Sequence, residues 1–404
     1  MEQLMKQMET VKSDVGMCYK STSLISVAEI IHETVKSFKG EKNYMATGDL
    51  SNENTKELDF ITHANRPSRA DLTAKKGDVV LARMKATNKV LLVQDIEADY
   101  IYSTGFIVLR PSKVIDNNYL LHFLQSSTFQ DEKDKLCTGA TQKAINNQNF
   151  AQLQIPLPPL PIQKRIAEIL DAADALKRKD QELLKKYDEL AQAIFIDMFG
   201  DPVKNEKGWE VKRLDELLLK GEKISYGVVQ PGDDFPNGVP IVRVGDFKLM
   251  KIDKTNLKKI NPEIETTYNR TRLKGDEILI ACVGSVGKIA LADESLKGFN
   301  IVRATAKVRV DHNIINRTYL AFHLSQISIQ NYFIAETRTS SQPTLNIKQI
   351  EETKILVPPI RIQNQFNLLS TDLLKQIEMV NDSNSDGLFQ TLIQKAFKGE
   401  LVAE

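Results

Sequence analysis

Two short segments have residue types that could support catalysis, but each lacks a part that the chemistry needs. Gly284-Ser285-Val286-Gly287-Lys288 resembles a phosphate-binding loop, yet such a loop needs glycine at position 282 and serine or threonine at 289. This chain has Cys282 and Ile289 there, so a backbone turn is the expected structure. Glu352-Thr353-Lys354 has the Glu-x-Lys spacing of nuclease sites without a convincing upstream partner. These segments therefore predict no nucleotide or nuclease chemistry.

Methylation and metal motifs are missing from the sequence as well. Pro158-Pro159 and Pro358-Pro359 follow Leu157 and Val357, where a methyltransferase motif would have Asn or Asp. The 3 cysteines are far apart, and the 5 histidines show no metal spacing. We expect His122 and His323 to be helix residues at the edge of a core. The chain is predicted to have no catalytic residues, no metal site and no cofactor of its own.

Composition describes a globular chain with little global charge. The chain has 404 residues, 42% hydrophobic and 26% charged, with a net charge of +1. No apolar run approaches the length of a membrane span, and the first 20 residues lack an apolar signal core, so we expect a cytoplasmic protein. Residues 1–155 are neutral, whereas residues 201–355 carry 24 basic and 20 acidic side chains. Any binding of nucleic acid must therefore rest on local clusters of basic residues.

The chain contains one unit twice. The segment Ile155–Gln163 returns as Ile355–Gln363, 200 positions later. Lys76-Gly77-Asp78 corresponds to Lys274-Gly275-Asp276 at nearly the same offset. Buried-strand candidates mixed with turns and short helices predict the α+β class for each copy. The predicted segments are a first domain with a short N-terminal helix (1–155), a helix (156–200), a second domain (201–355) and a second helix (356–404).

Both helices follow a Pro-Pro step, and both carry an apolar stripe. Apolar residues at a spacing of 3.5 are typical of a coiled coil, and an ordinary core helix is the alternative. Asp180 is the polar exception in the first stripe and could set the register. Residues 381–387 are polar and should interrupt the second helix. The predicted seam consists of Ile162, Ile166, Ile169, Ala173, Leu176, Leu183, Tyr187, Leu190, Ile362, Phe366, Leu369 and Leu373.

Two domains that each end in a Pro-Pro-x-x-Ile-Gln step into a long helix resemble the specificity subunit of type I restriction–modification systems. Met198-Phe199-Gly200-Asp201 and Trp209–Glu216 add to the resemblance, which covers almost the whole chain. The resemblance implies two similar target-recognition domains in inverted arrangement, separated by two long helices that form an antiparallel coiled coil. It implies that each domain recognises one half of a split, asymmetric DNA site.

The resemblance also implies partners and their cofactors. Double-stranded DNA, two methyltransferase subunits and restriction subunits would bind this chain. S-adenosylmethionine, ATP and Mg²⁺ would belong to those subunits. A non-enzymatic coiled-coil scaffold for other proteins is the alternative function. A fused restriction–methylation enzyme is a third possibility, which the missing motifs disfavour.

DNA contacts are expected from polar and basic residues in loops, because base edges and phosphates offer hydrogen-bond partners to such side chains. For each candidate, a solvated surface side chain without a DNA contact is an equal alternative. For Tyr226, the equal alternative is packing in the core. The candidates in the first domain are Arg66, Arg69, Lys85, Asn88, Lys89, Thr141, Gln142 and Lys143. Those in the second are Tyr226, Lys248, Lys251, Lys254, Arg270, Arg272, Ser285, Lys288, Arg338, Ser340, Ser341 and Gln342.

Overall fold

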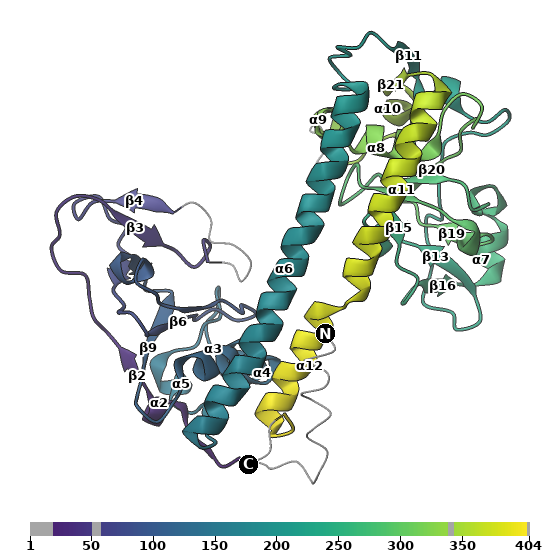
Figure 1. Cartoon of the computed structure of the whole chain (residues 1–404). Helices are drawn as coiled ribbons and strands as arrows, with labels where there is room; N and C mark the ends of the chain where they lie inside the picture. Colours follow the sequence, from purple (N-terminus) through teal and green to yellow (C-terminus); the bar gives the residue numbers. More distant parts are fainter. Residues whose placement is uncertain (1–18, 51–57, 338–342, 402–404) are drawn as a thin grey trace. The chain divides into compact units, whose positions relative to one another are not determined.

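The computed structural model describes residues 19–50, 58–337 and 343–401, which form two compact units (Figure 1). Unit 1 contains residues 1–182 and 381–404, and unit 2 contains residues 183–380. Each unit combines sheets with helices, which confirms the α+β class. The division differs from the four predicted segments because each unit takes in parts of both long helices. The predicted N-terminal helix lies outside the described residues.

Unit 1 contains two four-stranded sheets and a two-stranded ribbon. The sheet orders are β2-β9-β6-β7 and β4-β3-β8-β5, and the ribbon pairs β1 with β10. The strands are β1 (Ser21–Ser23), β2 (Ala28–Ile31), β3 (Lys42–Met45), β4 (Asp59–Ile61), β5 (Ala70–Leu72), β6 (Val79–Ala82), β7 (Val90–Leu92), β8 (Ile101–Ser103), β9 (Phe106–Pro111) and β10 (Gln154–Pro156).

Strand β6 is a continuous apolar run because both of its faces are buried. Val79 and Leu81 belong to a core shared with helices, whereas Val80 and Ala82 belong to a second core between the sheets. Successive side chains point to opposite faces of a strand, so a strand covered on both faces needs no polar position. The helices are α2 (Leu24–Val27), η1 (Glu97–Asp99), α3 (Asn117–Gln125), α4 (Ser127–Lys135), α5 (Asn147–Phe150), the first part of α6 (Leu160–Phe199), and α12 (Ser385–Lys398).

Unit 2 repeats this plan, but its second sheet has three strands instead of four, and it has one additional two-stranded sheet. The sheet orders are β12-β20-β17-β18 and β16-β13-β19, and β11 pairs with β21 and β14 with β15. Its strands are β11 (Glu210–Arg213), β12 (Ser225–Tyr226), β13 (Val239–Val242), β14 (Phe247–Lys248), β15 (Lys251–Ile252), β16 (Lys258–Ile260), β17 (Ile278–Ala281), β18 (Ile289–Leu291), β19 (Asn300–Ile301), β20 (Thr305–Val308) and β21 (Lys354–Val357). Its helices are η2 (Leu214–Leu217), η3 (Val244–Asp246), α7 (Pro262–Thr266), η4 (Asn269–Thr271), η5 (Glu294–Leu296), α8 (Arg317–Ser325), α9 (Ile327–Thr337), α10 (Ile347–Glu351), α11 (Ile360–Asp382) and the second part of α6.

The repeated Pro-Pro-x-x-Ile-Gln step places a buried glutamine at the start of each long helix. Gln163 is 1% exposed; its Oε1 accepts from the Asp116 backbone N–H at 2.8 Å, and its Nε2 donates to the carbonyls of Val114 and Pro158 at 3.0 and 2.8 Å. Gln363 makes the same three bonds, to Asn316, Ile314 and Pro358. The amide therefore ties the helix start to the loop that precedes α3 or α8.

Replacing Gln163 by alanine should destabilise unit 1 by about 2 kcal/mol, because buried backbone groups would lose their partner. Thermal denaturation followed by circular dichroism measures the change. Gln181→Ala is the matched control, since Gln181 is exposed on the same helix α6. Equal midpoints for the two variants would show that the buried amide has no stabilising role.

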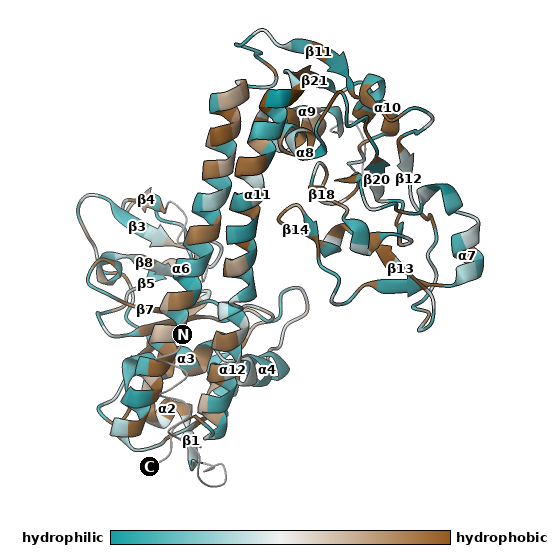
Figure 2. Cartoon of the chain, turned by 45° about the vertical axis from the view of Figure 1, so that its right-hand side comes forward, coloured by the Kyte–Doolittle hydropathy of each residue, from teal (hydrophilic) through white to brown (hydrophobic). Residues whose placement is uncertain are grey.

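Within each unit the long helices pair in antiparallel directions. In unit 1, Lys177 pairs with Asp386 at 2.6 Å and Ser383 donates to Asp180 at 2.7 Å, so residue numbers rise on one helix as they fall on the other. In unit 2, the rings of Phe195 and Phe366 lie 5.6 Å apart. Figure 2 shows hydrophobic residues at intervals along the long helices, with hydrophilic residues between them. Each pair buries this apolar stripe against its own domain.

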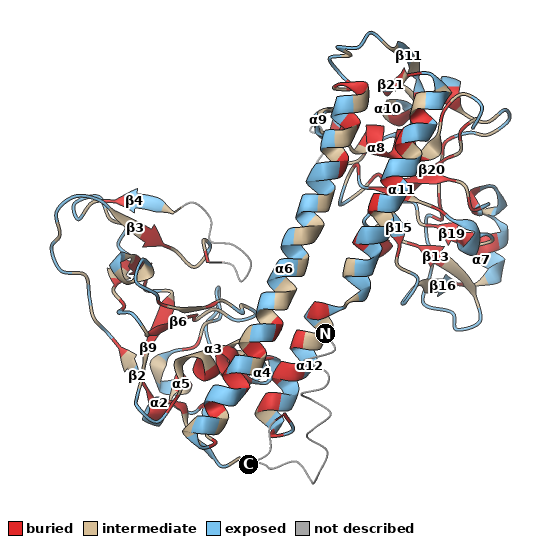
Figure 3. Ribbon diagram, in the orientation of Figure 1, coloured by how far each residue is buried: buried red, intermediate tan, exposed pale blue. Residues whose placement is uncertain are grey.

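The buried part of α6 is divided into two stretches. Figure 3 shows buried residues toward both ends of α6 and largely exposed ones between them. Of the predicted seam, Ile166, Ala173 and Phe366 are fully buried, and Leu373 is 9% exposed. Ile162, Ile169, Leu176, Leu183 and Tyr187 are half-buried.

Two positions of the predicted seam are wrong. Leu190 and Leu369 are 47% and 53% exposed. Near Leu190 the buried stripe passes instead through Ala191 and Phe195, because the helix packs on a domain as well as on its partner helix. A strict 3.5 spacing describes a pure two-helix seam and does not describe this wider contact.

The second long helix is interrupted, as residues 381–387 predicted. α11 ends at Asp382 and α12 begins at Ser385, with Asn384 at a left-handed φ of 48° between them. The interruption is shorter than the polar stretch. It lies opposite Asp180, the polar exception in the stripe of α6, which accepts the hydrogen bond from Ser383. Ser383, at the break in the second helix, and Asp180, the polar residue of the first, are thus hydrogen-bond partners.

Ala173→Asp should unfold or strongly destabilise unit 1, by about 3 kcal/mol or more, because Ala173 is 1% exposed and its cluster is apolar. Leu190→Asp introduces the same charge on the same helix at an exposed position and should change stability by less than about 0.5 kcal/mol. Urea denaturation compares the two variants. Equal sensitivity at both positions would contradict the observed division of α6.

Two residues that contact each other in the second repeat are both replaced in the first. His323 is fully buried on α8, and its Nε2 accepts the Leu356 backbone N–H at 3.1 Å. At the equivalent positions 200 residues earlier, the first repeat has Phe123 and Pro156. Proline has no backbone N–H, so Phe123 leaves no donor without a partner. Both His122 and His323 are buried helix residues, as predicted.

Burial lowers the pKa of His323 to about 3, so the folded protein holds a neutral imidazole. Since this pKa lies below the unfolded value of about 6.5, the stabilisation is present above pH 6.5 and is lost as pH falls toward 3. His323→Phe should remove this pH dependence but leave the Leu356 N–H without a partner, lowering stability by about 1–3 kcal/mol. Adding Leu356→Pro should recover part of that loss. Thermal midpoints between pH 4 and 8 test both expectations, and a pH profile unchanged by His323→Phe would refute them.

Candidate nucleic-acid interface

Two loops of unit 1 bring most of the predicted DNA-contacting residues of the first domain together. The loop between β6 and β7 contains Lys85 and Asn88, and a second loop contains Thr141, Gln142 and Lys143. The Lys85 backbone N–H donates to the Lys143 carbonyl at 2.9 Å, so the two loops lie side by side. The side chains of Lys85, Thr141, Gln142 and Lys143 are exposed. The two adjoining loops therefore present polar and basic side chains side by side.

The second loop is closed at its base and tight at its tip. Thr138 and Ala144 exchange backbone hydrogen bonds at 3.0 and 2.9 Å. Gly139 has a φ of +128°, and a Cβ there would lie 2.6 Å from the Gln142 carbonyl oxygen. Only glycine tolerates this conformation, so the tight approach of the chain to the Gln142 carbonyl requires glycine at position 139.

A buried lysine supports the loop between β6 and β7 from behind. Lys133 of α4 is 0% exposed, and its Nζ donates to the carbonyls of Met84 and Thr87 at 3.1 and 2.7 Å. Burial lowers the pKa of Lys133. The equivalent residue in unit 2 is Phe333, which is also fully buried. Sequence analysis missed Lys133, since nothing in its local pattern distinguishes it from a solvated lysine.

Some of the other candidates of unit 1 form hydrogen bonds or ion pairs within the protein. Arg66 forms an ion pair with Asp71 at 2.7 Å, and the Lys89 Nζ donates to the Thr47 carbonyl at 2.6 Å. Asn88 donates to the Gln125 carbonyl at 3.0 Å. Arg69 is exposed. Arg66 and Lys89 therefore have structural partners.

Unit 2 has the equivalent pair of loops. The segment Gly284–Lys288 joins strands β17 and β18, which confirms the expected turn, whereas a phosphate-binding loop would lead into a helix. A bridge between Val283 and Thr344 ties this turn to the loop before α10. Ser285 is exposed, and the Lys288 Nζ donates to the Phe247 carbonyl. Four predicted contacts on the second loop lie outside the described residues: Arg338, Ser340, Ser341 and Gln342.

Four further basic candidates of unit 2 are engaged with other residues. Lys248 pairs with Asp253 and Lys251 with Glu378 of α11, both at 2.6 Å. Lys254 donates to the Ser295 hydroxyl at 2.8 Å. Arg272 forms a two-pronged ion pair with Glu265. For these residues the structure shows intramolecular partners, and a DNA contact by any of them stays a prediction.

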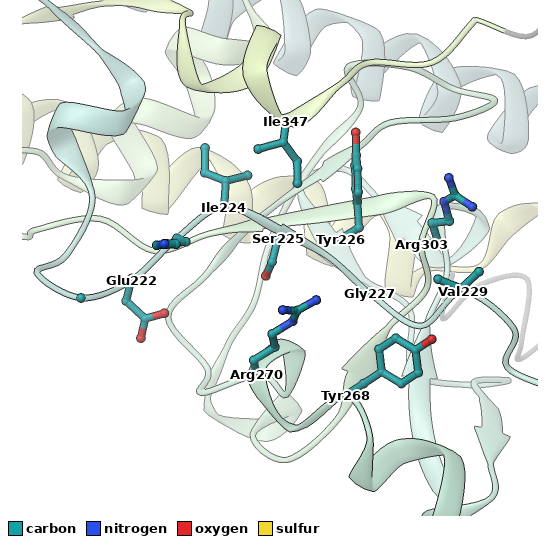
Figure 4. Close-up of a pocket in the computed structure, with 12 residues that line it drawn as sticks. Glu222, Ile224, Ser225, Tyr226, Gly227, Val229, Tyr268, Arg270, Arg303 and Ile347 are labelled. Atoms are coloured by element: carbon teal, nitrogen blue, oxygen red, sulfur yellow. The ribbon is translucent and has the colours of Figure 1, made fainter.

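A groove of about 780 Å³ lies in unit 2 beside Tyr226 (Figure 4). Tyr226 lines this groove and is half-buried. Its hydroxyl donates to the Leu345 carbonyl at 2.8 Å, and burial raises the pKa of that hydroxyl. Exposed Arg270 lines the same groove. Sequence analysis missed Lys223, Tyr268 and Arg303, which also line it. These residues come from separate segments of the chain, and no sequence spacing connects them.

Catalytic alternatives find no support in the described residues. Within those ranges, no group of three or more His, Cys, Asp or Glu side chains could hold a metal ion. Burial raises the pKa of the Cys282 thiol to about 12, so it stays protonated. None of the helices in the described part of the chain combines the length and apolar character that a membrane span requires.

The architecture is that of one α+β domain present twice. The type I restriction modification DNA specificity domain matches residues 22–186 and again 206–384. The chain therefore belongs to this family, and it contains two copies of the domain.

Two relatives agree with this assignment, and a solved structure shares the fold. The chain is 27% identical over 296 residues to the specificity subunit of the type I restriction enzyme EcoBI of Escherichia coli, covering 66% of this chain and 62% of that subunit. It thus spans less than two thirds of that relative's length. It is 24% identical over 351 residues to the EcoKI specificity subunit of Escherichia coli strain K12, covering 81% and 75%. The crystal structure of a type I restriction–modification S subunit from M. genitalium is similar in fold, with a TM-score of 0.56 and 15% identity over 96% of this chain and 98% of that one.

Proposed function

We propose that this chain is the non-catalytic, sequence-specific DNA-binding subunit of a type I restriction–modification complex. Each domain recognises one half of a bipartite, asymmetric DNA site. The observation that carries the proposal is the repetition of one α+β domain with two adjoining loops, which in unit 1 expose Thr141, Gln142 and Lys143. Non-identical loops on a shared scaffold suit the recognition of two different short sequences.

The proposal includes partner subunits. Two methyltransferase subunits using S-adenosylmethionine, and restriction subunits using ATP and Mg²⁺, supply the chemistry in the cytoplasm. The relatives' designation as subunits of restriction enzymes supports this assignment. The chain by itself then neither methylates nor cleaves DNA.

Methylation by the assembled complex tests the function. The chain purified with its methyltransferase subunit should methylate a random-sequence DNA library at one bipartite site, and the chain alone should methylate nothing. Methylation at a contiguous site, or without sequence selection, would contradict the proposal. Methyl transfer by the chain alone would contradict its non-catalytic assignment.

Gln142 provides a test at the level of one residue. Gln142→Ala should relax sequence choice in one half-site only, by roughly tenfold, because a glutamine amide can make two hydrogen bonds to an adenine edge. The other half-site should stay unchanged. Gln152→Ala is the control, since Gln152 is an exposed glutamine of the same domain outside the two loops. Sequencing of methylated products measures both half-sites, and equal relaxation in both would argue against a base contact.

A further inference from the structure

The arginines that the structure describes between residues 201 and 337 fall into two groups. Most are held by partners within the described residues: Arg213 by Asp215, Arg243 by Asp246, Arg272 by Glu265, Arg309 by Asp276, and Arg317 by the carbonyls of Gly275 and Ala292. Arg270 and Arg303 differ, since neither guanidinium has a hydrogen bond or ion pair to a side chain or carbonyl in the part of the chain that the structure describes. Both are exposed, and both line the same groove.

The groove offers these two cations no acidic partner. Its single carboxylate among the lining residues is Glu222. That carboxylate pairs with Lys274 at 3.0 Å and with Arg309 at 3.1 Å. Partial burial opposes ionisation, but the hydrogen bonds from Lys274 and Arg309 lower the pKa of Glu222. Its charge is therefore already balanced, and the groove presents a net positive surface.

The backbone holds Arg303 at this position. Its N–H donates to the Val228 carbonyl at 2.8 Å, and Val228 donates in turn to the Ile301 carbonyl at 2.7 Å. Gly227 permits this close approach, because a Cβ there would lie 1.8 Å from the Ile301 carbonyl oxygen. Figure 4 shows Arg270, Arg303, Tyr226 and Tyr268 around one hollow. Unlike a flexible surface arginine, Arg303 starts from a fixed backbone.

The groove also continues toward the two loops of the candidate interface. A second hollow of about 480 Å³ shares Tyr226, Val229 and Arg303 with the first. It extends to Val283 and Thr344, the two residues whose bridge ties the loops together. A strand of DNA contacting those loops would therefore meet the arginines next.

We propose that this groove binds the phosphodiester backbone of one DNA strand at the second half-site, with Arg270 and Arg303 as its phosphate contacts. The inference rests on the proposed function and adds the residues that position DNA on the second domain. Guanidinium groups without carboxylate partners match phosphate geometry, and two oxygens of one phosphate can accept from a single arginine. Such contacts orient the duplex and carry no sequence information.

DNA-binding measurements on the assembled complex test the inference. The probes are two duplexes: the bipartite site found by methylation sequencing, and the same DNA with its second half-site scrambled. Arg270→Gln and Arg303→Gln should each lower affinity about tenfold on both duplexes. Each should also reduce the slope of log affinity against log salt concentration by about 0.9. Arg303→Lys keeps the charge and should keep the slope.

Lys297→Gln is the matched control, because it removes one exposed positive charge of the same domain outside the groove, and it should change affinity less than twofold. Thermal midpoints confirm that every variant is folded. Arginine variants that behave like Lys297→Gln, in a complex that still selects its site, would overturn the groove assignment and leave the proposed function intact. A loss confined to the intact second half-site would overturn the phosphate assignment in favour of base contacts. A wild-type complex without sequence selection would instead overturn the proposed function, and the phosphate contacts would then be judged from nonspecific affinity alone.

Discussion

The hydrophobic core of each domain is completed by two helices, one from each repeat. In unit 1, Ile166 and Leu170 of the first long helix and Phe389 and Leu392 of the second join the same cluster as the sheet and α3. In unit 2, Phe195 of the first helix and Phe366 of the second do the same. Neither repeat could bury all of its apolar surface alone, because one of the two long helices that cover it comes from the other copy. The helices are therefore structural parts of the domains as well as connections between them.

The buried glutamines show how the repeats keep this arrangement while their sequences diverge. Gln163 and Gln363 make the same three hydrogen bonds with chemically different neighbours, because all the partners are backbone groups. Elsewhere a change in one residue is matched by a change in its contact, as with His323 and Leu356 against Phe123 and Pro156. Buried polar groups must have partners, so the backbone donor and its acceptor are gained or lost together.

Because backbone and core contacts hold the scaffold, the loops can differ between the two repeats. The turn between β6 and β7 rests on Lys133, whereas the turn between β17 and β18 has Phe333 at the corresponding place. The basic residues also differ in role, since Arg272 and Arg309 form ion pairs with carboxylates within unit 2. The unpaired arginines of the groove remain available for an external anion. A scaffold held by backbone and core contacts can thus present different surfaces on its two copies.

The sequence alone determined the duplication, the α+β class, the helix starts and the interruption near residue 384. These features depend on local patterns: a repeated motif, apolar periodicity, and a run of residues with poor helix propensity. Seam positions such as Leu190 and Leu369 were wrong because burial depends on which surfaces meet a helix, and the domain widens that contact beyond a heptad. The groove with Arg270 and Arg303 was decided only by tertiary structure. Its residues lie on segments that are distant in sequence, and whether an arginine is free depends on which carboxylates the fold places beside it.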